Sequence, residues 1–239
     1  MKVTALCMEC LKEFGHPGFE IFNLPYYENR IAIAECSHGH KSALVLQSQK
    51  FEVLMESGAS ALLNGFTLEA CATFYAALER TYEFAIRVFM RAKQIDNESF
   101  AGMFKEMARM SERQVGAFMA LYLLATGNVY RMDTELSKFR NGIIHKGIIP
   151  NPEKAGDFCS VVYTKIIDIV NVLKNDFPEH VTEVVVADMF ERQSSLEINM
   201  PKATTTGTIF FNLSFSGDKK NFHEAMESFK DATQRLQMS

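Results

Sequence analysis

Hydrophobic residues follow two different spacings along the chain, and the change of spacing falls near residue 50. Before that point, the stretches 19–23, 30–36 and 42–49 are short and alternating or apolar, as β-strands are. Turn-forming residues separate them, at Pro17–Gly18, at Pro25 and in the sequence SHGH at 37–40. After residue 50, apolar residues recur every three or four positions, which is the spacing of one face of a helix. The pattern therefore predicts a small β-rich segment followed by helices.

The helices expected after this point lie at 50–65, 67–93, 97–110, 111–127, 133–147, 153–176 and 179–192. Thr67, Ser111 and Asp133 are the expected N-terminal caps, because their side-chain oxygens can accept hydrogen bonds from the first turn. The apolar residues of 67–93 cover so wide a sector that we expect this helix to pack on more than one side. In the tail, the alternation in TIFFNLSF, residues 208–215, predicts a strand, and 220–237 predicts an amphipathic helix.

These elements predict a mainly α protein in three parts: a β-rich module at 1–48, a helical bundle at 49–178, and an extension of helix, strand and helix at 179–239. The net charge of −4 argues against a protein wholly devoted to nucleic acid, but it leaves room for a local basic cleft. No apolar run is long enough to span a membrane, and the first residues lack the apolar segment of a signal peptide. We therefore expect a cytoplasmic protein without a membrane partner.

Sulfur and imidazole groups are concentrated in the β-rich segment. Cys7 and Cys10 form a C-x-x-C pair, and Cys36 is followed by His38 and His40. Thiolates and imidazoles in two such groups suit tetrahedral Zn²⁺, and a small module with little core gains stability from a structural metal. The expected ligands are Cys7, Cys10, Cys36 and His40, with His38 as the substitute for His40. The arrangement resembles a zinc ribbon in which one cysteine has become histidine; the alternative is a free C-x-x-C with unrelated histidines.

A second group of polar residues lies in SKFRNGIIHKGIIP, residues 137–150. On a helical wheel, Arg140 falls on the apolar face between Leu136 and Ile144. A guanidinium on such a face requires a carboxylate, a phosphate or a partner subunit. His145 lies about 140° further round an ideal helix, so the two side chains converge only if the helix is distorted, which Gly142 permits. The carbonyl end of this helix favours the protonated form of His145.

The sequence RNGIIH resembles the R-x4–6-H signature of the HEPN superfamily, in which a polar residue, often Asn, follows the arginine. The helical stretch from 50 to 178 resembles the bundle of that family, and the signature lies late in the bundle, as it does there. The resemblance implies a homodimeric endoribonuclease that cleaves RNA without a catalytic metal. It also suggests a role as a toxin or antiviral effector with an antitoxin or other protein partner. Arg140 would then hold the scissile phosphate, His145 would transfer a proton and Asn141 would orient the pair. The sites of such proteins commonly form across the dimer interface.

Charged residues recur at steps of four in the helix at 67–93: Glu79, Glu83, Arg87 and Arg91. Two interpretations stay open, either a solvated charged face with i,i+4 pairs, or a pairing of Glu79 or Glu83 with Arg140 to which Arg80 adds a phosphate contact. For the whole protein, the alternative to a ribonuclease is a catalytically inactive HEPN-like dimer that serves as a scaffold for a nucleotide, an RNA or a protein. A zinc-ribbon nucleic-acid adaptor is disfavoured, because the first 48 residues hold few Lys or Arg.

Overall fold

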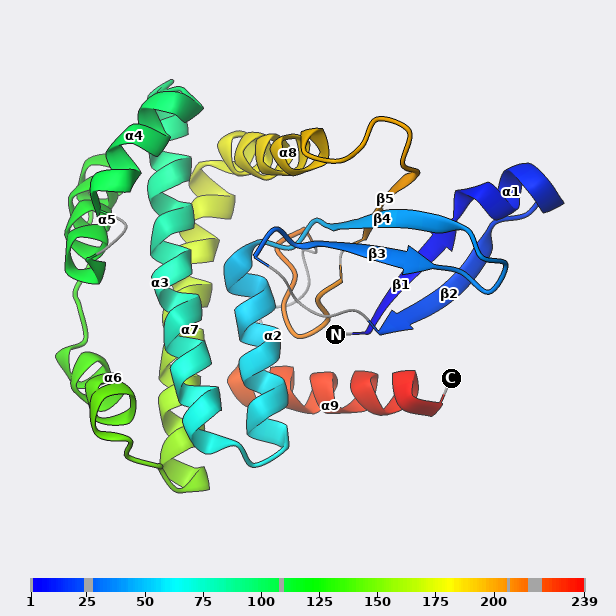
Figure 1. Ribbon diagram of the computed structural model, residues 1–239. Helices are drawn as coiled ribbons and strands as arrows, with labels where there is room; N and C mark the ends of the chain where they lie inside the picture. Colours follow the sequence, from blue (N-terminus) through cyan, green and yellow to red (C-terminus); the bar gives the residue numbers. More distant parts are fainter. Residues whose placement is uncertain (1, 24–27, 108–109, 206, 215–220, 239) are drawn as a thin grey trace.

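The computed structural model describes residues 2–23, 28–107, 110–205, 207–214 and 221–238 (Figure 1). Its strands are β1 (Lys2–Cys7), β2 (Gly18–Asn23), β3 (Ile31–Glu35), β4 (Lys41–Leu46) and β5 (Lys202–Thr205). Its helices are α1 (Met8–Phe14), α2 (Lys50–Leu63), α3 (Thr67–Ala92), α4 (Asn97–Met107), α5 (Ser111–Thr126), α6 (Thr134–Lys146), α7 (Pro152–Asp176), α8 (Pro178–Ser194) and α9 (Phe222–Met238). A mainly helical protein with a small N-terminal strand module and a C-terminal strand and helix confirms the predicted fold class.

Helix α3 is the centre of the helical part, where it contacts α2, α5, α6, α7 and α8. Figure 1 shows α3 and α7 running side by side along the height of the molecule, with α5 and α6 on the side away from the strands. Tyr82 and Ile86 on one part of the α3 surface and Phe74, Phe84 and Val88 on another are all buried. The prediction that this helix packs on more than one side is therefore confirmed, because a helix that is apolar most of the way round is stable only inside the protein.

Two small sheets lie beyond α2. Strands β1 and β2 pair antiparallel, while β3, β4 and β5 form a second sheet in which β3–β4 is antiparallel and β4–β5 is parallel. Strand β5 comes from the predicted 179–239 extension, so this extension and the 1–48 segment share a sheet. The hydrophobic pattern does not predict β1 and α1, which have only six and seven residues and are too short to show a period.

The position predicted for the C-terminal strand is wrong: residues 208–214 form no strand, and Phe215 lies outside the described residues. Two carboxylates of α2 explain the difference. Glu56 accepts hydrogen bonds from the backbone N–H groups of Ile209 and Phe210, and Glu52 accepts one from that of Leu213. Phe210 and Leu213 are buried in the helical core. Since side chains satisfy these buried N–H groups, the segment needs no neighbouring strand.

The helix caps follow the prediction in part. Asp133 caps α6 as predicted, because its Oδ1 accepts hydrogen bonds from the N–H groups of Glu135 and Leu136 at 3.0 and 3.4 Å. The predictions for Thr67 and Ser111 are wrong by one position, since each is the first residue of its helix. Phe66 and Met110 occupy the cap positions there and form no side-chain cap hydrogen bond. Tertiary packing therefore defines the starts of α3 and α5 more than local capping does.

An ion-paired group joins the three-stranded sheet to α8. Nη2 of Arg30 lies 2.6 Å from Oδ1 of Asp188, and Nη2 of Arg192 lies 2.9 Å from Oδ2. Both guanidinium groups also donate to backbone carbonyls, Arg30 to Ser48 at 2.8 Å and Arg192 to Leu46 at 2.9 Å. Burial opposes ionisation of Asp188, but the charges of the two arginines outweigh it and lower the pKa of this carboxyl. The group thus remains charged in a largely buried position because its charges are paired.

The buried Glu52 makes the stability of this fold depend on pH. Its side chain is 2% exposed, and burial raises its pKa to about 7, although the N–H groups of Gln49 and Leu213 and the charges of Arg30 and Lys174 act in the opposite direction. A glutamate in the unfolded chain has a pKa of about 4.3, so the Glu52 carboxyl group binds its proton more tightly in the folded state than in the unfolded chain. The contribution of Glu52 to the free energy of unfolding is therefore fully present below about pH 4.3 and is lost as the pH rises to about 7.

The side chain in the Glu52→Gln variant cannot ionise. We therefore expect this variant not to lose stability in this way as the pH rises. Between pH 4.5 and 8 the free energy of unfolding of the variant should gain about 2–3 kcal/mol relative to that of the wild type. Urea unfolding at several pH values measures the difference. Glu35→Gln is the control, because Glu35 is exposed and lies 3.6 Å from Lys41. If the free energy of unfolding of Glu52→Gln differs from that of the wild type by the same amount at every pH, the raised pKa of Glu52 is contradicted.

Candidate functional site

Four potential metal ligands meet where α1 and the turn between β3 and β4 lie together. Cys7 ends β1, Cys10 lies in the first turn of α1, Cys36 follows β3, and His40 precedes β4. Their ligand atoms all lie within 4.8 Å of one another, and the three cysteines are buried. The structure therefore brings together the complete set that the sequence predicts, Cys7, Cys10, Cys36 and His40, in a group that we call the cysteine–histidine cluster.

The distances within the cysteine–histidine cluster fit one metal ion. Sγ of Cys10 lies 3.8 Å from Sγ of Cys36, and Nδ1 of His40 lies 3.4 Å from Sγ of Cys10 and 3.7 Å from Sγ of Cys7. A tetrahedral zinc ion with Zn–S of about 2.3 Å and Zn–N of about 2.1 Å separates its ligand atoms by roughly 3.5–3.8 Å. The cluster can therefore hold a metal ion such as zinc without a change in its shape.

The surroundings of the cysteine–histidine cluster also suit a cation. Nε2 of His40 lies 2.8 Å from Oε2 of Glu13, which leaves Nδ1 to face the sulfur atoms. Burial, together with the neighbouring Cys7 and Cys36, raises the pKa of Cys10 to about 12. Burial also opposes ionisation of Cys36, but hydrogen bonds from the backbone of His38 and His40 outweigh it and lower the pKa of that thiol. Backbone N–H groups thus stabilise one thiolate at the site before any metal binds.

His38, the substitute ligand, lies at the edge of the cysteine–histidine cluster. Its side chain is exposed, and its Nδ1 lies 3.5 Å from Sγ of Cys10. It belongs to a different group, with Glu20 and Cys36, and its ring packs 4.8 Å from that of Phe14. The geometry therefore favours His40 over His38 as the fourth ligand, in agreement with the order of preference from the sequence.

Arg140 is the second predicted site residue, and it lies on the face of α6 that packs on α3. Its Nη2 is 3.7 Å from Oε1 of Glu79, and its guanidinium lies over the ring of Tyr75 at 5.4 Å from the ring centre. Its Nη1 donates to Oδ1 of Asn141 at 3.1 Å. The guanidinium is only half-buried, with 26% of the side chain exposed. The carboxylate partner that the wheel requires for Arg140 is therefore Glu79.

His145 lies in the last turn of the same helix and is exposed. Among the described residues, we find no hydrogen bond or ion pair that joins it to Arg140 or to any other side chain. Helix α6 ends at Gly147, whose φ of +64° suits glycine, and the N–H groups of Gly147 and Ile148 donate to the carbonyls of Ile143 and Gly142. Within one chain, Arg140 therefore faces α3, whereas His145 is exposed in the last turn of α6, and the two side chains are not in contact.

The other two supporting residues lie elsewhere. Arg80 donates to Glu83 at 2.5 Å and to Oε1 of Gln114 at 3.2 Å, and Arg87 lies 3.9 Å from Glu83. Of the two carboxylates considered for Arg140, the structure thus pairs Glu79 with it and turns Glu83 to the other arginines of α3. Glu79 keeps a raised pKa, because its burial outweighs the charges of Arg140 and Arg80.

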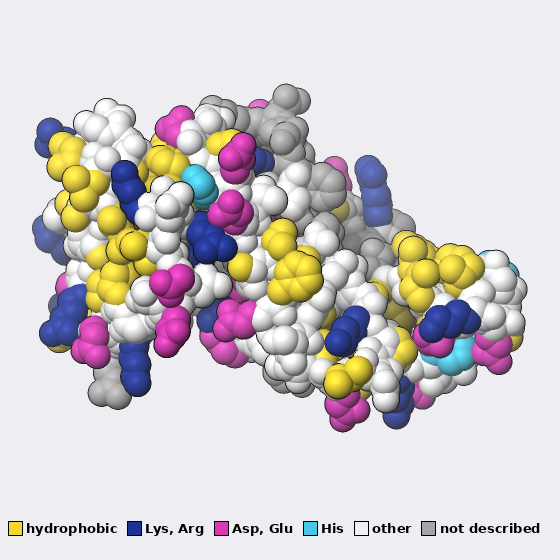
Figure 2. All heavy atoms as spheres, turned by 90° about the horizontal axis from the view of Figure 1, so that it is seen from above, with side chains coloured by type: hydrophobic (Ala, Val, Ile, Leu, Met, Phe, Trp, Pro, Cys, Tyr) yellow, Lys and Arg dark blue, Asp and Glu magenta, His cyan; other side chains and the backbone are white. Residues whose placement is uncertain are grey.

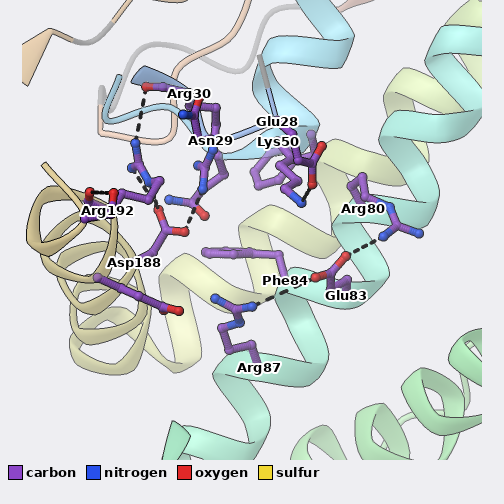
Figure 3. Close-up of a pocket in the computed structure, with 14 residues that line it drawn as sticks. Glu28, Asn29, Arg30, Lys50, Arg80, Glu83, Phe84, Arg87, Asp188 and Arg192 are labelled. Atoms are coloured by element: carbon purple, nitrogen blue, oxygen red, sulfur yellow. Dashed lines mark hydrogen bonds and ion pairs between the residues drawn. The ribbon is translucent and has the colours of Figure 1, made fainter. Parts of the chain in front are cut away.

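The sequence does not predict the group around Asp188. Arg30, Asp188 and Arg192 line a cavity of about 350 Å³ together with Arg80, Glu83 and Arg87, which we call the charged pocket (Figure 3). The sequence feature that could have indicated this group is the i,i+4 spacing of Asp188 and Arg192 in a helix. That spacing alone also fits an exposed pair, and nothing in it indicates Arg30, which is 158 residues away from Asp188.

Among the described residues, no helix has both the length and the apolar composition needed to cross a membrane. Figure 2 shows charged side chains of both signs spread over the face that it draws, with hydrophobic side chains gathered on the side of α4 and α5. Exposed apolar residues on α5 include Leu123 and Leu124, which are 45% and 76% exposed. Exposed apolar side chains also lie on α1 and the strands, where Phe14 and Ile33 are 44% and 51% exposed.

We expect the purified protein to hold one metal ion per chain. His40→Ala should lower the affinity for zinc at least about tenfold, because it removes one of four ligands, whereas the matched variant His38→Ala should leave the metal content unchanged. Atomic emission spectroscopy of gel-filtered protein measures the metal content per chain. Thermal unfolding with and without a chelator measures the effect of the metal on stability. Equal metal loss in both variants, or no metal in the wild type, would refute the assignment of His40.

Comparison with known proteins identifies no relative of this chain. No family model matches the chain, no curated protein matches its sequence, and no solved structure matches it. The function therefore has to be inferred from the arrangement of the chain's own side chains.

Proposed function

We propose that the protein is an HEPN-like endoribonuclease that cleaves RNA by attack of the 2′-hydroxyl group and needs no catalytic metal. The observation that carries the proposal is the placement of RNGIIH on α6: Arg140 is held by Glu79 and Tyr75 of α3, while His145 is exposed five residues later. A restrained cation and an accessible imidazole, here on one helix but not in contact, are the two kinds of group that cleavage of a phosphodiester by proton transfer needs at one phosphate.

Arg140 is suited to hold a phosphate. Its ion pair with Glu79, at 3.7 Å, is longer than an ordinary hydrogen bond, and Asn141 accepts from one of its five N–H donors. The remaining donors are available on a side chain that is partly exposed. The ring of Tyr75 restricts the guanidinium further. An arginine that is restrained on one side and open on the other loses little conformational freedom when it binds a phosphate.

His145 is suited to proton transfer, but one imidazole does not complete the reaction. The 2′-oxygen bonds to phosphorus while the bond from phosphorus to the 5′-oxygen breaks, which leaves a 2′,3′-cyclic phosphate and a 5′-hydroxyl. A base must take the proton of the 2′-hydroxyl, and an acid must give one to the 5′-oxygen. Two histidines divide these roles, so we infer that the His145 side chains of two subunits face one RNA strand.

The surface around His145 fits such a dimer. Ile144, Ile148 and Ile149 are 47%, 54% and 74% exposed, so an apolar area surrounds the histidine at the end of α6. Apolar side chains gathered in this way favour contact with another protein surface. A two-fold axis through this area would bring each residue near its own copy, which is the arrangement that the chemistry needs.

The cysteine–histidine cluster has a structural part in this proposal. Three thiolates and one imidazole fill the four positions of a tetrahedral zinc ion, so no position remains for a water or a substrate. We propose that zinc holds α1 and the β3–β4 turn together and takes no part in cleavage. An inactive HEPN-like dimer that serves as a scaffold is the second candidate, favoured by the engagement of Arg140 with Glu79 in the isolated chain.

We expect the wild type to cleave RNA in the presence of EDTA and to leave 2′,3′-cyclic phosphate ends. Arg140→Ala and His145→Ala should each lower the rate by about 10²–10⁴-fold, since each removes a charge or a proton donor from the transition state. Lys138→Ala is the matched control on α6, because Lys138 is exposed and pairs with Glu135 rather than with the residues of the proposed site. Gel assays of labelled RNA measure the rates. If the wild type forms a dimer and binds RNA but produces no cleavage, the scaffold function holds instead.

We expect Ile149→Lys to separate the dimer and abolish cleavage, because it puts a charge into the proposed interface. The side chain of Ile149 is 74% exposed, so the substitution should change the stability of the single chain by less than about 0.5 kcal/mol. Ile198→Lys is the control, since Ile198 is 94% exposed and follows α8. Sedimentation measures the mass. A dimer that survives Ile149→Lys with full activity would refute this interface.

A further inference from the structure

The charged pocket lies apart from α6 and needs a separate explanation. It forms where the first turn of α2, the middle of α3, the last turns of α8 and the residues before β3 meet, and it has a volume of about 350 Å³. Figure 3 shows Lys50 at the start of α2 and Arg80 and Arg87 on α3, with Phe84 between Glu83 and Asp188. A volume of this size suits a small molecule and excludes a folded segment of protein or RNA.

Cations exceed carboxylates in the charged pocket. Five cationic side chains line it, from Arg30, Lys50, Arg80, Arg87 and Arg192, against four carboxylates. Two of these carboxylates each lie between two arginines: Asp188 binds Arg30 and Arg192, and Glu83 binds Arg80 and lies 3.9 Å from Arg87. Glu28 pairs with Lys50 while its own side chain is 85% exposed. Arg30 and Arg192 also donate to backbone carbonyls and Arg80 donates to Gln114, whereas Arg87, which lies 3.9 Å from Glu83, retains N–H donors that Glu83 does not use.

Two features strengthen the attraction for an anion. Lys50 is the first residue of the 14-residue helix α2, so the positive end of that helix adds to its charge. Arg30 is 5% exposed, its φ is +51°, and its Nε has no hydrogen-bond partner among the described residues. A strained and buried arginine at the wall of a cavity raises the positive potential there at a cost in stability.

We propose that the charged pocket binds a small phosphorylated sugar, with the phosphate between Lys50, Arg80 and Arg87. Arginine and lysine donors at a helix N-terminus match the oxygens of a phosphate group. The carboxylates on the opposite wall, Asp188 and Glu191, are acceptors that suit the hydroxyl groups of a sugar. The sugar phosphate can come as a free metabolite or as part of a mononucleotide, because both present the same groups to these residues. This binding does not depend on the proposed cleavage at α6.

Isothermal titration of the full chain with inorganic phosphate, ribose, ribose 5-phosphate and adenosine monophosphate tests the proposal. We expect ribose 5-phosphate to bind more tightly than inorganic phosphate, and ribose to show no binding. Tighter binding of the nucleotide than of ribose 5-phosphate assigns the pocket to mononucleotides, and the reverse assigns it to free sugar phosphates. Absence of binding by every phosphate compound at millimolar concentration overturns the proposal.

Lys50→Gln and Arg87→Gln should each weaken binding of ribose 5-phosphate about tenfold or more, because each removes a charged donor. Arg91→Gln is the matched control: Arg91 lies one turn beyond Arg87 on α3 and pairs with Glu183 at 3.0 Å, outside the charged pocket. His145→Ala should bind ribose 5-phosphate as the wild type does, which separates this site from the proposed ribonuclease site. Unchanged affinity in both Lys50→Gln and Arg87→Gln overturns the proposal.

Discussion

The pairing of Asp188 with two arginines is the interaction that determines how the strands sit on the helices. Asp188 lies on α8, Arg30 stands directly before β3, and Arg192 reaches the carbonyl of Leu46 at the end of β4. One carboxylate thus fixes both strands of the β3–β4 hairpin at their open end. Loss of the carboxylate would leave two guanidinium groups facing each other in a largely buried position, which is far more costly than loss of a surface ion pair.

The same hairpin carries the cysteine–histidine cluster at its other end. Cys36 follows β3 and His40 precedes β4, so about five residues of strand, or roughly 17 Å, separate the cluster from Arg30 and Leu46. The hairpin is therefore held at one end by an ion-paired group and at the other by groups that suit a metal ion. Among the described residues, the buried apolar side chains of the strands form two small clusters, Ala5, Ala34, Leu44 and Leu46 in one and Ile31, Ala43 and Val45 in the other. With so small a core, the ion-paired group and the cysteine–histidine cluster, which could hold a metal ion, are further sources of stability for this module.

Residues near one another in sequence are the ones that the sequence predicts well. The period of α3 and the cap Asp133 each depend on neighbours within one element or one turn, so the helix and its start can be read directly. The candidate metal ligands form two short groups, Cys7 with Cys10 and Cys36 with His40, and each group shows in its local spacing although 26 positions separate Cys10 from Cys36. The non-local carboxylates are different. Glu52 and Glu56 look like ordinary polar residues of α2, yet they replace the ladder hydrogen bonds that a strand at 208–214 would need. Nothing within that segment's own alternation signals that its partners lie more than 150 positions earlier.

Two adjacent residues of α3, Glu79 and Arg80, face the two regions for which a function is proposed, α6 and the charged pocket. Glu79 faces Arg140 on α6, while the adjacent Arg80 pairs with Glu83 at the charged pocket. The charge of Arg80 also lowers the pKa of Glu79, against the larger effect of burial. Arg80 therefore contributes charge both to the charged pocket and to the surroundings of Glu79, the carboxylate that pairs with Arg140 on α6.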